Sequence, residues 1–136
     1  AAAGLLLGLV SGGAVYAAAC STCHGGDRPP PFGGIDLALS SAISGPDARN
    51  AANIVLSGIR PREGERSPIM PGFADSMTDE QIAALLTYLR ARFGGQPAWT
   101  GTVETVRDAR RSQSAMLQIS PSPPNAPTEA TKRDKP

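Results

Sequence analysis

Both cysteines and the single histidine of this 136-residue chain lie within five residues, from Cys20 to His24. Two thiols two residues apart, followed at once by an imidazole, form the pattern that attaches a c-type haem. On one helical turn, Cys20 and Cys23 can form thioethers with the two vinyl groups of one porphyrin. His24 can then bind the iron. We therefore expect one covalent haem c held by these three residues.

Other uses of a cysteine pair fit the sequence less well. A zinc site needs four ligands, and the chain has no second pair of cysteine or histidine residues. A thioredoxin-like redox pair needs a βαβ unit, whereas the residues that flank Cys20 are rich in alanine and glycine and favour a helix. A disulfide between Cys20 and Cys23 would be strained. Haem attachment remains the best interpretation of the motif.

The sixth ligand of the iron has few candidates. There is no second histidine, and the two lysines, Lys132 and Lys135, stand in the C-terminal tail. Met70 stands in the proline-flanked stretch 68–73, whose backbone freedom is restricted even in the unfolded chain. Such a stiff segment can hold a thioether on iron, so we predict Met70 as the ligand. A water-bound or open iron is the alternative.

The ring of His24 needs a partner that fixes its orientation, because such a bond also raises the basicity of the imidazole. The run of prolines at 29–31 lacks backbone donors but keeps its carbonyl oxygens as acceptors. We expect the carbonyl of Pro30 or Pro31 to accept from the His24 ring. A rigid turn without haem contact is the alternative.

Two arginines and one tryptophan are further candidates for contact with the haem. Arg60 and Arg62 could pair with the propionates, and a solvated charged loop is the alternative. Trp99 could cover the haem or pack the last helix onto the domain, and we favour packing.

The rest of the chain must position these groups, and its pattern is mostly helical. Helices are expected over 11–20, 47–57, 78–93 and 102–111. The third is the clearest, because Thr78 and Gln81 form a capping box and leucines follow at helical spacing. Gly12 and Tyr16 share one face of the first helix, and Tyr88 lies on a face that could receive them.

The composition of the chain limits the size of its core and the kinds of partner that its charge can attract. Aromatic residues make up only 4% of the chain, so a protein-only core would be thin and a haem would complete it. The formal net charge is +1, and two propionates would bring it close to zero. No nucleic-acid partner is therefore expected.

We divide the chain into four parts. Residues 1–10 are an apolar lead-in that is too short to span a bilayer and lacks the basic start of a signal peptide. We expect them to be a fragment or processed start that leads into the first helix. Contact with a membrane or a partner is the alternative. Residues 11–95 form the domain, and residues 96–112 form an extension with a possible short helix. Residues 113–136 are rich in proline and serine and are expected to be a disordered tail.

These motifs resemble a class I cytochrome c domain of the small bacterial type. The resemblance implies a mostly α fold wrapped around one covalent haem, with the first and last helices of the domain crossing at the glycine and the aromatic residue. It covers about residues 10–95 and rests on these pieces: Gly12, Tyr16, Cys20-Ser21-Thr22-Cys23-His24, Met70-Pro71-Gly72-Phe73, and Leu85 with Tyr88.

A narrower resemblance concerns the stretches 54–60, 70–73 and 95–106. They are similar to the last haem domain of cytochrome subunits that serve periplasmic dehydrogenases, although those subunits usually carry three haem domains and this chain has one motif. The resemblance implies a periplasmic electron carrier, not an enzyme, which relays single electrons from a dehydrogenase subunit, another redox protein or a neighbouring haem towards the respiratory chain. In complex with such a partner it could lie at the membrane. Residues 96–136 could instead wrap a large partner as a docking arm.

Two other functions are weighed against electron transfer. A gas-binding or catalytic haem protein would need an open sixth position on the iron, and the chain offers no second histidine as a distal group. A purely structural haem domain that docks a catalytic subunit is the third hypothesis. His/Met ligation would favour electron transfer, because it saturates the iron and raises its potential.

Overall fold

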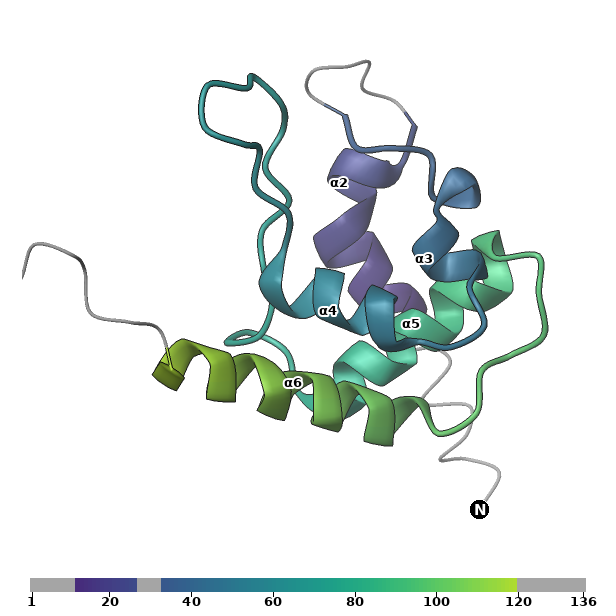
Figure 1. Ribbon diagram of the computed structural model, residues 1–136. Coiled ribbons are helices and arrows are strands. Elements are labelled where there is room, and N and C mark those ends of the chain that lie inside the picture. Colours follow the sequence, from purple (N-terminus) through teal and green to yellow (C-terminus); the bar gives the residue numbers. More distant parts are fainter. Residues whose placement is uncertain (1–11, 27–32, 120–136) are drawn as a thin grey trace, which may run out of the picture.

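The structure, a computed structural model, describes residues 12–26 and 33–119 (Figure 1). These residues form helices and one isolated antiparallel bridge, between Ile59 and Met70, and contain no strand. The mostly α fold predicted from the sequence is therefore confirmed. After a helical turn at residues 12–15, the elements are η1 (Tyr16–Cys20), α2 (Ser21–His24), η2 (Leu37–Leu39), α3 (Ser41–Ser44), α4 (Arg49–Ser57), α5 (Asp79–Phe93) and α6 (Thr102–Ile119).

The first helix runs without a break from residue 12 to His24, with the wider π-helical segment η1 in its middle. Alanine is the best helix former, and three successive alanines precede Cys20. The helix ends at Gly25, whose N–H donates to the carbonyl of Ser21 at 2.8 Å. The haem-attachment motif therefore occupies the last helical turn, facing the loop that follows.

The first helix crosses α5 at the predicted contact. A Cβ atom on Gly12 would lie 2.3 Å from the carbonyl oxygen of Ala84, so only glycine allows the two backbones to approach this closely. The ring of Tyr16 lies 5.5 Å from that of Tyr88 and 5.7 Å from that of Phe93. This crossing anchors the motif helix on the rest of the domain.

Helix α5 has the predicted capping box. The Thr78 side chain accepts from the Gln81 N–H, and the Gln81 side chain accepts from the Thr78 N–H. Gly94 caps the other end of the helix. Ile82, Leu85 and Leu86 are almost completely buried, so α5 forms the centre of the core.

Helix α4 begins at Arg49, two residues later than expected, and the Asp47 carboxylate accepts from the Arg49 N–H at 2.9 Å. It ends at Ser57, because Gly58 takes a left-handed conformation with φ of 71°. Ala51 and Val55 of this helix are buried.

Helix α6 is longer than the short helix expected over 102–111. It continues to Ile119, so residues 113–119, which we assigned to a disordered tail, are helical. Val106 and Ala109 are fully buried against α4 and α5, and Gln113 bonds to Asn53 of α4. These contacts with distant residues extend the helix, which lies across α4 and α5 in Figure 1. The lead-in 1–10 and residues 120–136 lie outside the described residues.

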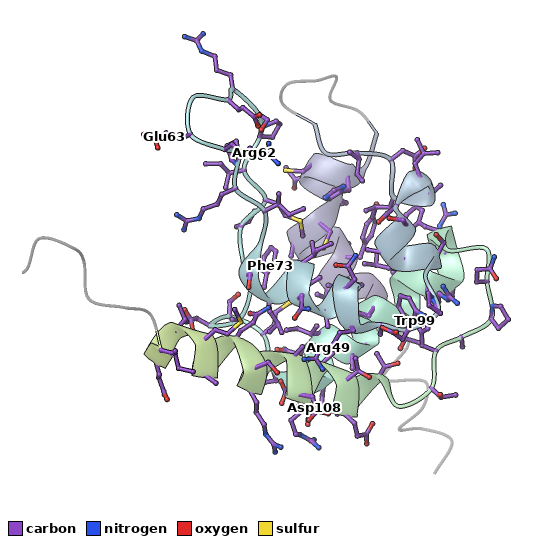
Figure 2. All side chains as sticks on the ribbon, viewed as in Figure 1. Arg49, Arg62, Glu63, Phe73, Trp99 and Asp108 are labelled. Atoms are coloured by element: carbon purple, nitrogen blue, oxygen red, sulfur yellow. The ribbon has the colours of Figure 1, made fainter. Side chains whose placement is uncertain are left out.

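Trp99 packs onto the domain, as favoured from the sequence. Its indole N–H donates to the carbonyl of Gly45 at 3.0 Å, and the guanidinium of the buried Arg90 lies 4.5 Å from the ring centre. Arg90 also donates to the carbonyls of Ile43, Gly45 and Pro97. The segment before α6 is thereby fixed to α5 (Figure 2). Among the described helices, none is long and apolar enough to cross a membrane.

Candidate haem site

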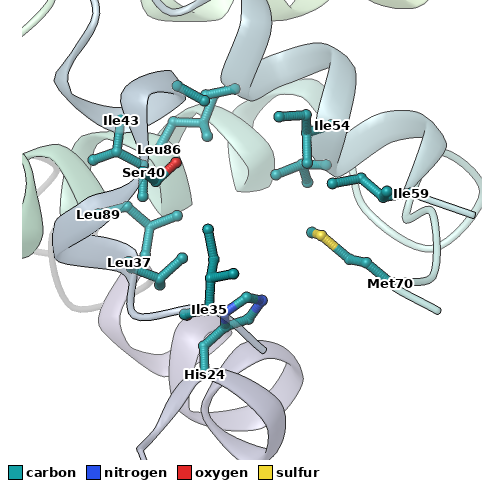
Figure 3. Close-up of a pocket in the computed structure, with 13 residues that line it drawn as sticks. His24, Ile35, Leu37, Ser40, Ile43, Ile54, Ile59, Met70, Leu86 and Leu89 are labelled. Atoms are coloured by element: carbon teal, nitrogen blue, oxygen red, sulfur yellow. Dashed lines mark hydrogen bonds between the residues drawn. The ribbon is translucent and has the colours of Figure 1, made fainter. Parts of the chain in front are cut away.

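An apolar pocket opens between the first helix (residues 12–24), α3, α4, α5 and the segment around Met70 (Figure 3). It holds about 490 Å³ of space, part of which is open to solvent. His24 and Met70 enter it from different elements, and both side chains point into the pocket in Figure 3. The lining residues are His24, Ile35, Leu37, Ser40, Ala42, Ile43, Ala51, Ile54, Val55, Ile59, Met70, Leu86 and Leu89.

His24 is held by the two residues Gly34 and Ile35. The ring nitrogen Nδ1 donates to the carbonyl of Ile35 at 3.0 Å, which leaves Nε2 with its free lone pair to bind iron. A Cβ atom on Gly34 would lie 2.5 Å from Cε1 of the imidazole, so the glycine backbone packs directly on the ring. The Gly34 N–H also donates to the carbonyl of Cys23 at 2.8 Å, which ties this segment to the motif.

The acceptor for the His24 ring therefore differs from the expected proline carbonyl. Pro30 and Pro31 lie outside the described residues, so a contact of Pro30 with the haem stays a prediction. Ile35 replaces them as the partner of Nδ1 because the chain folds back over the motif before η2, placing residue 35 beside the ring. The proline run precedes this return, but nothing in its sequence marks which carbonyl lies next to His24.

The two thiols lie on the same helical segment as His24, and they do not form a disulfide. Cys20 is half-buried, and Cys23 is exposed at the end of the helix. Burial, with a smaller contribution from Cys23, raises the pKa of the Cys20 thiol. Neither thiol lines the pocket, and His24, which directly follows Cys23 in the chain, is the motif residue that enters it.

Met70 is fixed by a close contact between two stretches of backbone. Its N–H donates to the carbonyl of Ile59 at 3.0 Å, and its carbonyl accepts from the Ile59 N–H at 2.9 Å. A Cβ atom on Gly58 would lie 2.2 Å from the carbonyl oxygen of Met70, and one on Gly72 would lie 2.7 Å from that of Leu56. Glycine is thus needed on both sides of this contact.

The predicted propionate partners, Arg60 and Arg62, are both exposed and do not line the pocket. Arg60 directly follows Ile59, which does, and Figure 2 shows Arg62 on the loop beyond it. Their role stays a prediction. Met77 is partly buried against the core, in keeping with a hydrophobic staple ahead of α5.

The residues that hold the two proposed ligands in place were not predicted from the sequence. Gly34 and Ile35 beside His24, and Ile59 paired with Met70, carry no local signal of these contacts. Gly58, which follows the helix predicted over 47–57, also makes room for the Met70 carbonyl. In each case the contact joins segments that become neighbours only through the fold.

The pocket fits a haem in its chemistry. Its walls are almost wholly aliphatic, as a porphyrin requires, and one imidazole and one thioether enter it from different elements. These are the two ligands of c-type haems with raised potentials. Among residues 12–26 and 33–119, no group of three or more His, Cys, Asp or Glu side chains forms a site for a bare metal ion.

Comparisons with known proteins identify the family of the chain. The family model described as cytochrome c oxidase, cbb3-type, subunit III matches residues 9–89. One subunit of the nicotinate dehydrogenase of Pseudomonas putida is 34% identical over 105 residues, which make up 75% of this chain and 9% of that protein. The chain thus spans about a tenth of the length of this relative.

Proposed function

This chain belongs to the class I cytochrome c domains, and we propose that it carries single electrons by means of one covalently attached, His/Met-ligated haem. When bound, the haem supplies an iron that gains or loses one electron. Cys20 and Cys23 are the proposed thioether positions, and His24 and Met70 are the proposed iron ligands. The observation that carries the proposal is the entry of His24 and Met70 into one aliphatic pocket.

The surrounding residues support electron transfer rather than substrate chemistry. The bond from Nδ1 to the Ile35 carbonyl holds the imidazole in one tautomer and orientation. The bridge between Ile59 and Met70 limits the movement of the thioether. Because both ligands are held in place, the protein needs little rearrangement when the charge of the iron changes.

We further propose that the electron donor is a dehydrogenase subunit or a neighbouring haem, and that the domain works in the periplasm of a bacterium. The similarity to a nicotinate dehydrogenase subunit supports a dehydrogenase partner. The need to attach haem c outside the bacterial cytoplasm supports the periplasm. The donor's substrate is left open, because the chain matches only 9% of that relative.

The partner would approach the open side of the pocket. Ile35 and Ile59 line the pocket but remain 63% and 51% exposed, and Ile69, next to Met70, is 65% exposed. Small apolar surfaces of this kind suit the short-lived contacts of redox proteins. Ile69→Asp should slow electron transfer from the donor severalfold with little change in potential. Leu117→Asp, at an exposed site on α6, is the matched control.

Replacement of Met70 tests the ligation. In Met70→Ala the reduction potential should fall and the ferrous protein should bind carbon monoxide, because the sixth position opens. Met77→Ala removes a methionine that does not line the pocket and should leave both properties unchanged. An unchanged potential in Met70→Ala would exclude Met70 as the ligand. Rapid binding of carbon monoxide by the unmodified protein would favour a gas-binding or catalytic haem.

A further inference from the structure

We propose that Arg110 of α6 is a positioning residue for the sixth ligand, which it acts on by holding the Met70 loop, residues 68–77. This inference rests on the proposed ligation of iron by Met70. It assigns to α6 a task beyond packing, and α6 lies outside the family match at residues 9–89.

The guanidinium of Arg110 joins the far end of the Met70 loop to α5. It donates to the carbonyl of Ala74, to the carbonyl of Met77 at 2.7 Å, and from Nε to the Asp79 carboxylate at 2.7 Å. Three donors of one planar group thus bind three acceptors within six residues of chain. The Arg110 side chain is 28% exposed and that of Asp79 is 22% exposed, so solvent screens this pair only in part.

Helix α4 holds the same loop from its other side. The N–H groups of Phe73 and Ala74 donate to the carbonyls of Val55 and Leu56 at 2.9 and 3.2 Å. The loop therefore presents its N–H groups to α4 and two carbonyls to Arg110. Loss of the guanidinium would leave the carbonyls of Ala74 and Met77 without this donor, only four and seven residues from Met70.

Arg110 stands on a well-anchored part of α6. Ala109, its neighbour, and Val106, one turn earlier, are fully buried. Arg49 of α4 donates to the Ser112 hydroxyl at 3.0 Å, and Gln113 donates to the Asn53 side chain at 3.2 Å. Because α6 is fixed to α4 in this way, the guanidinium can hold the loop against the same helix.

The test is the rate at which the ferrous holoprotein binds carbon monoxide, since Met70 must leave the iron before the gas can bind. In Arg110→Gln this rate should rise at least about tenfold, because the loss of a single charge-assisted hydrogen bond already corresponds to that factor. Arg110→Lys retains the charge but not the planar fork, so it should recover part of the slow rate.

Two matched variants separate this role from charge and from general stability. Arg107 is a second cation on α6. It lies 3.9 Å from Asp79 and makes no hydrogen bond to the Met70 loop, so Arg107→Gln should leave carbon monoxide binding slow. Val106→Ala weakens the packing of α6 and leaves the guanidinium in place. An acceleration in Val106→Ala equal to that in Arg110→Gln at matched urea stability would overturn the proposal.

Hydrogen exchange of the Phe73 and Ala74 amides gives a readout that does not depend on the ligand. Exchange should be faster in Arg110→Gln than in the unmodified protein, and unchanged exchange would contradict the proposal. If the unmodified protein itself binds carbon monoxide at once, then the ligation by Met70 fails, and this exchange measurement alone decides whether Arg110 holds the loop.

Discussion

The two sides of the haem pocket are built in different ways. On the His24 side, the two cysteines of the motif and the proposed ligand share one helical turn, and a nearby segment completes the site through Gly34 and Ile35. On the Met70 side, the proposed ligand stands in an irregular loop that is held by the end of α4 and by Arg110 of α6. The position of His24 follows largely from local geometry. The position of Met70 depends on residues as far away in the sequence as Arg110, 40 positions later.

This difference predicts which ligand is lost more easily. In the proposed holoprotein the histidine of the motif could not move far, because both thioethers and the helix would hold it. Met70 is held by contacts with separate elements, and each of these can be weakened alone. We therefore expect the Met70 side to open first when the protein is stressed.

Gly58→Ala should cause the largest loss of stability, because it disrupts the backbone contact that holds Met70. The left-handed backbone disfavours a side chain, and the new Cβ would lie 2.2 Å from the Met70 carbonyl. We expect a loss of roughly 3 kcal/mol in the free energy of unfolding, measured with urea, together with loss of the methionine ligand.

Gly64→Ala is the matched control, because Gly64 has φ of 86° and a Cβ atom added there would have no neighbouring atom within 4 Å. It should cost only about 1 kcal/mol from backbone strain. Equal losses in the two variants would mean that the contact between Gly58 and Met70 contributes nothing.

A smaller effect is expected from Gly34→Ala on the His24 side. The added methyl group would lie 2.5 Å from the imidazole, so the ring or the segment must shift. We expect a loss of about 1–3 kcal/mol and an altered electron paramagnetic resonance spectrum of the ferric protein, with the methionine ligand retained. Loss of Met70 rather than a shift of the histidine signal would contradict the independence of the two sides.

The smallest effect is expected at the start of α5, next to the Met70 loop. Thr78→Ala removes the side-chain acceptor of the capping box and should lower the free energy of unfolding by about 1 kcal/mol. Thr87→Ala, within the same helix, serves as the control and should change it by less, since alanine favours the helix interior. Equal losses would show that the cap does not secure the helix.

Local signals predicted much of this fold. The capping box of α5, the glycine that lets the first helix cross it, and the end of α4 at Ser57 were all visible in short stretches of sequence. The attachment motif likewise needs only five residues. Each of these features is decided by near neighbours in the chain, so sequence patterns predict it well.

The contacts that join distant segments could not be predicted. The acceptor for His24 is Ile35 because of how the chain returns over the motif. Helix α6 extends to Ile119 because Val106, Ala109 and Gln113 meet α4 and α5. Arg110 looks like any surface arginine in the sequence until the fold brings it to Ala74 and Met77.

The central claim is that His24 and Met70 both bind one haem iron. Its most direct test is the visible and near-infrared spectrum of the purified holoprotein, ferric and ferrous, with and without carbon monoxide. We predict a low-spin spectrum with a ferric sulfur-to-iron charge-transfer band, and a ferrous spectrum that carbon monoxide does not change on mixing. A high-spin spectrum that shifts at once with carbon monoxide would contradict the claim.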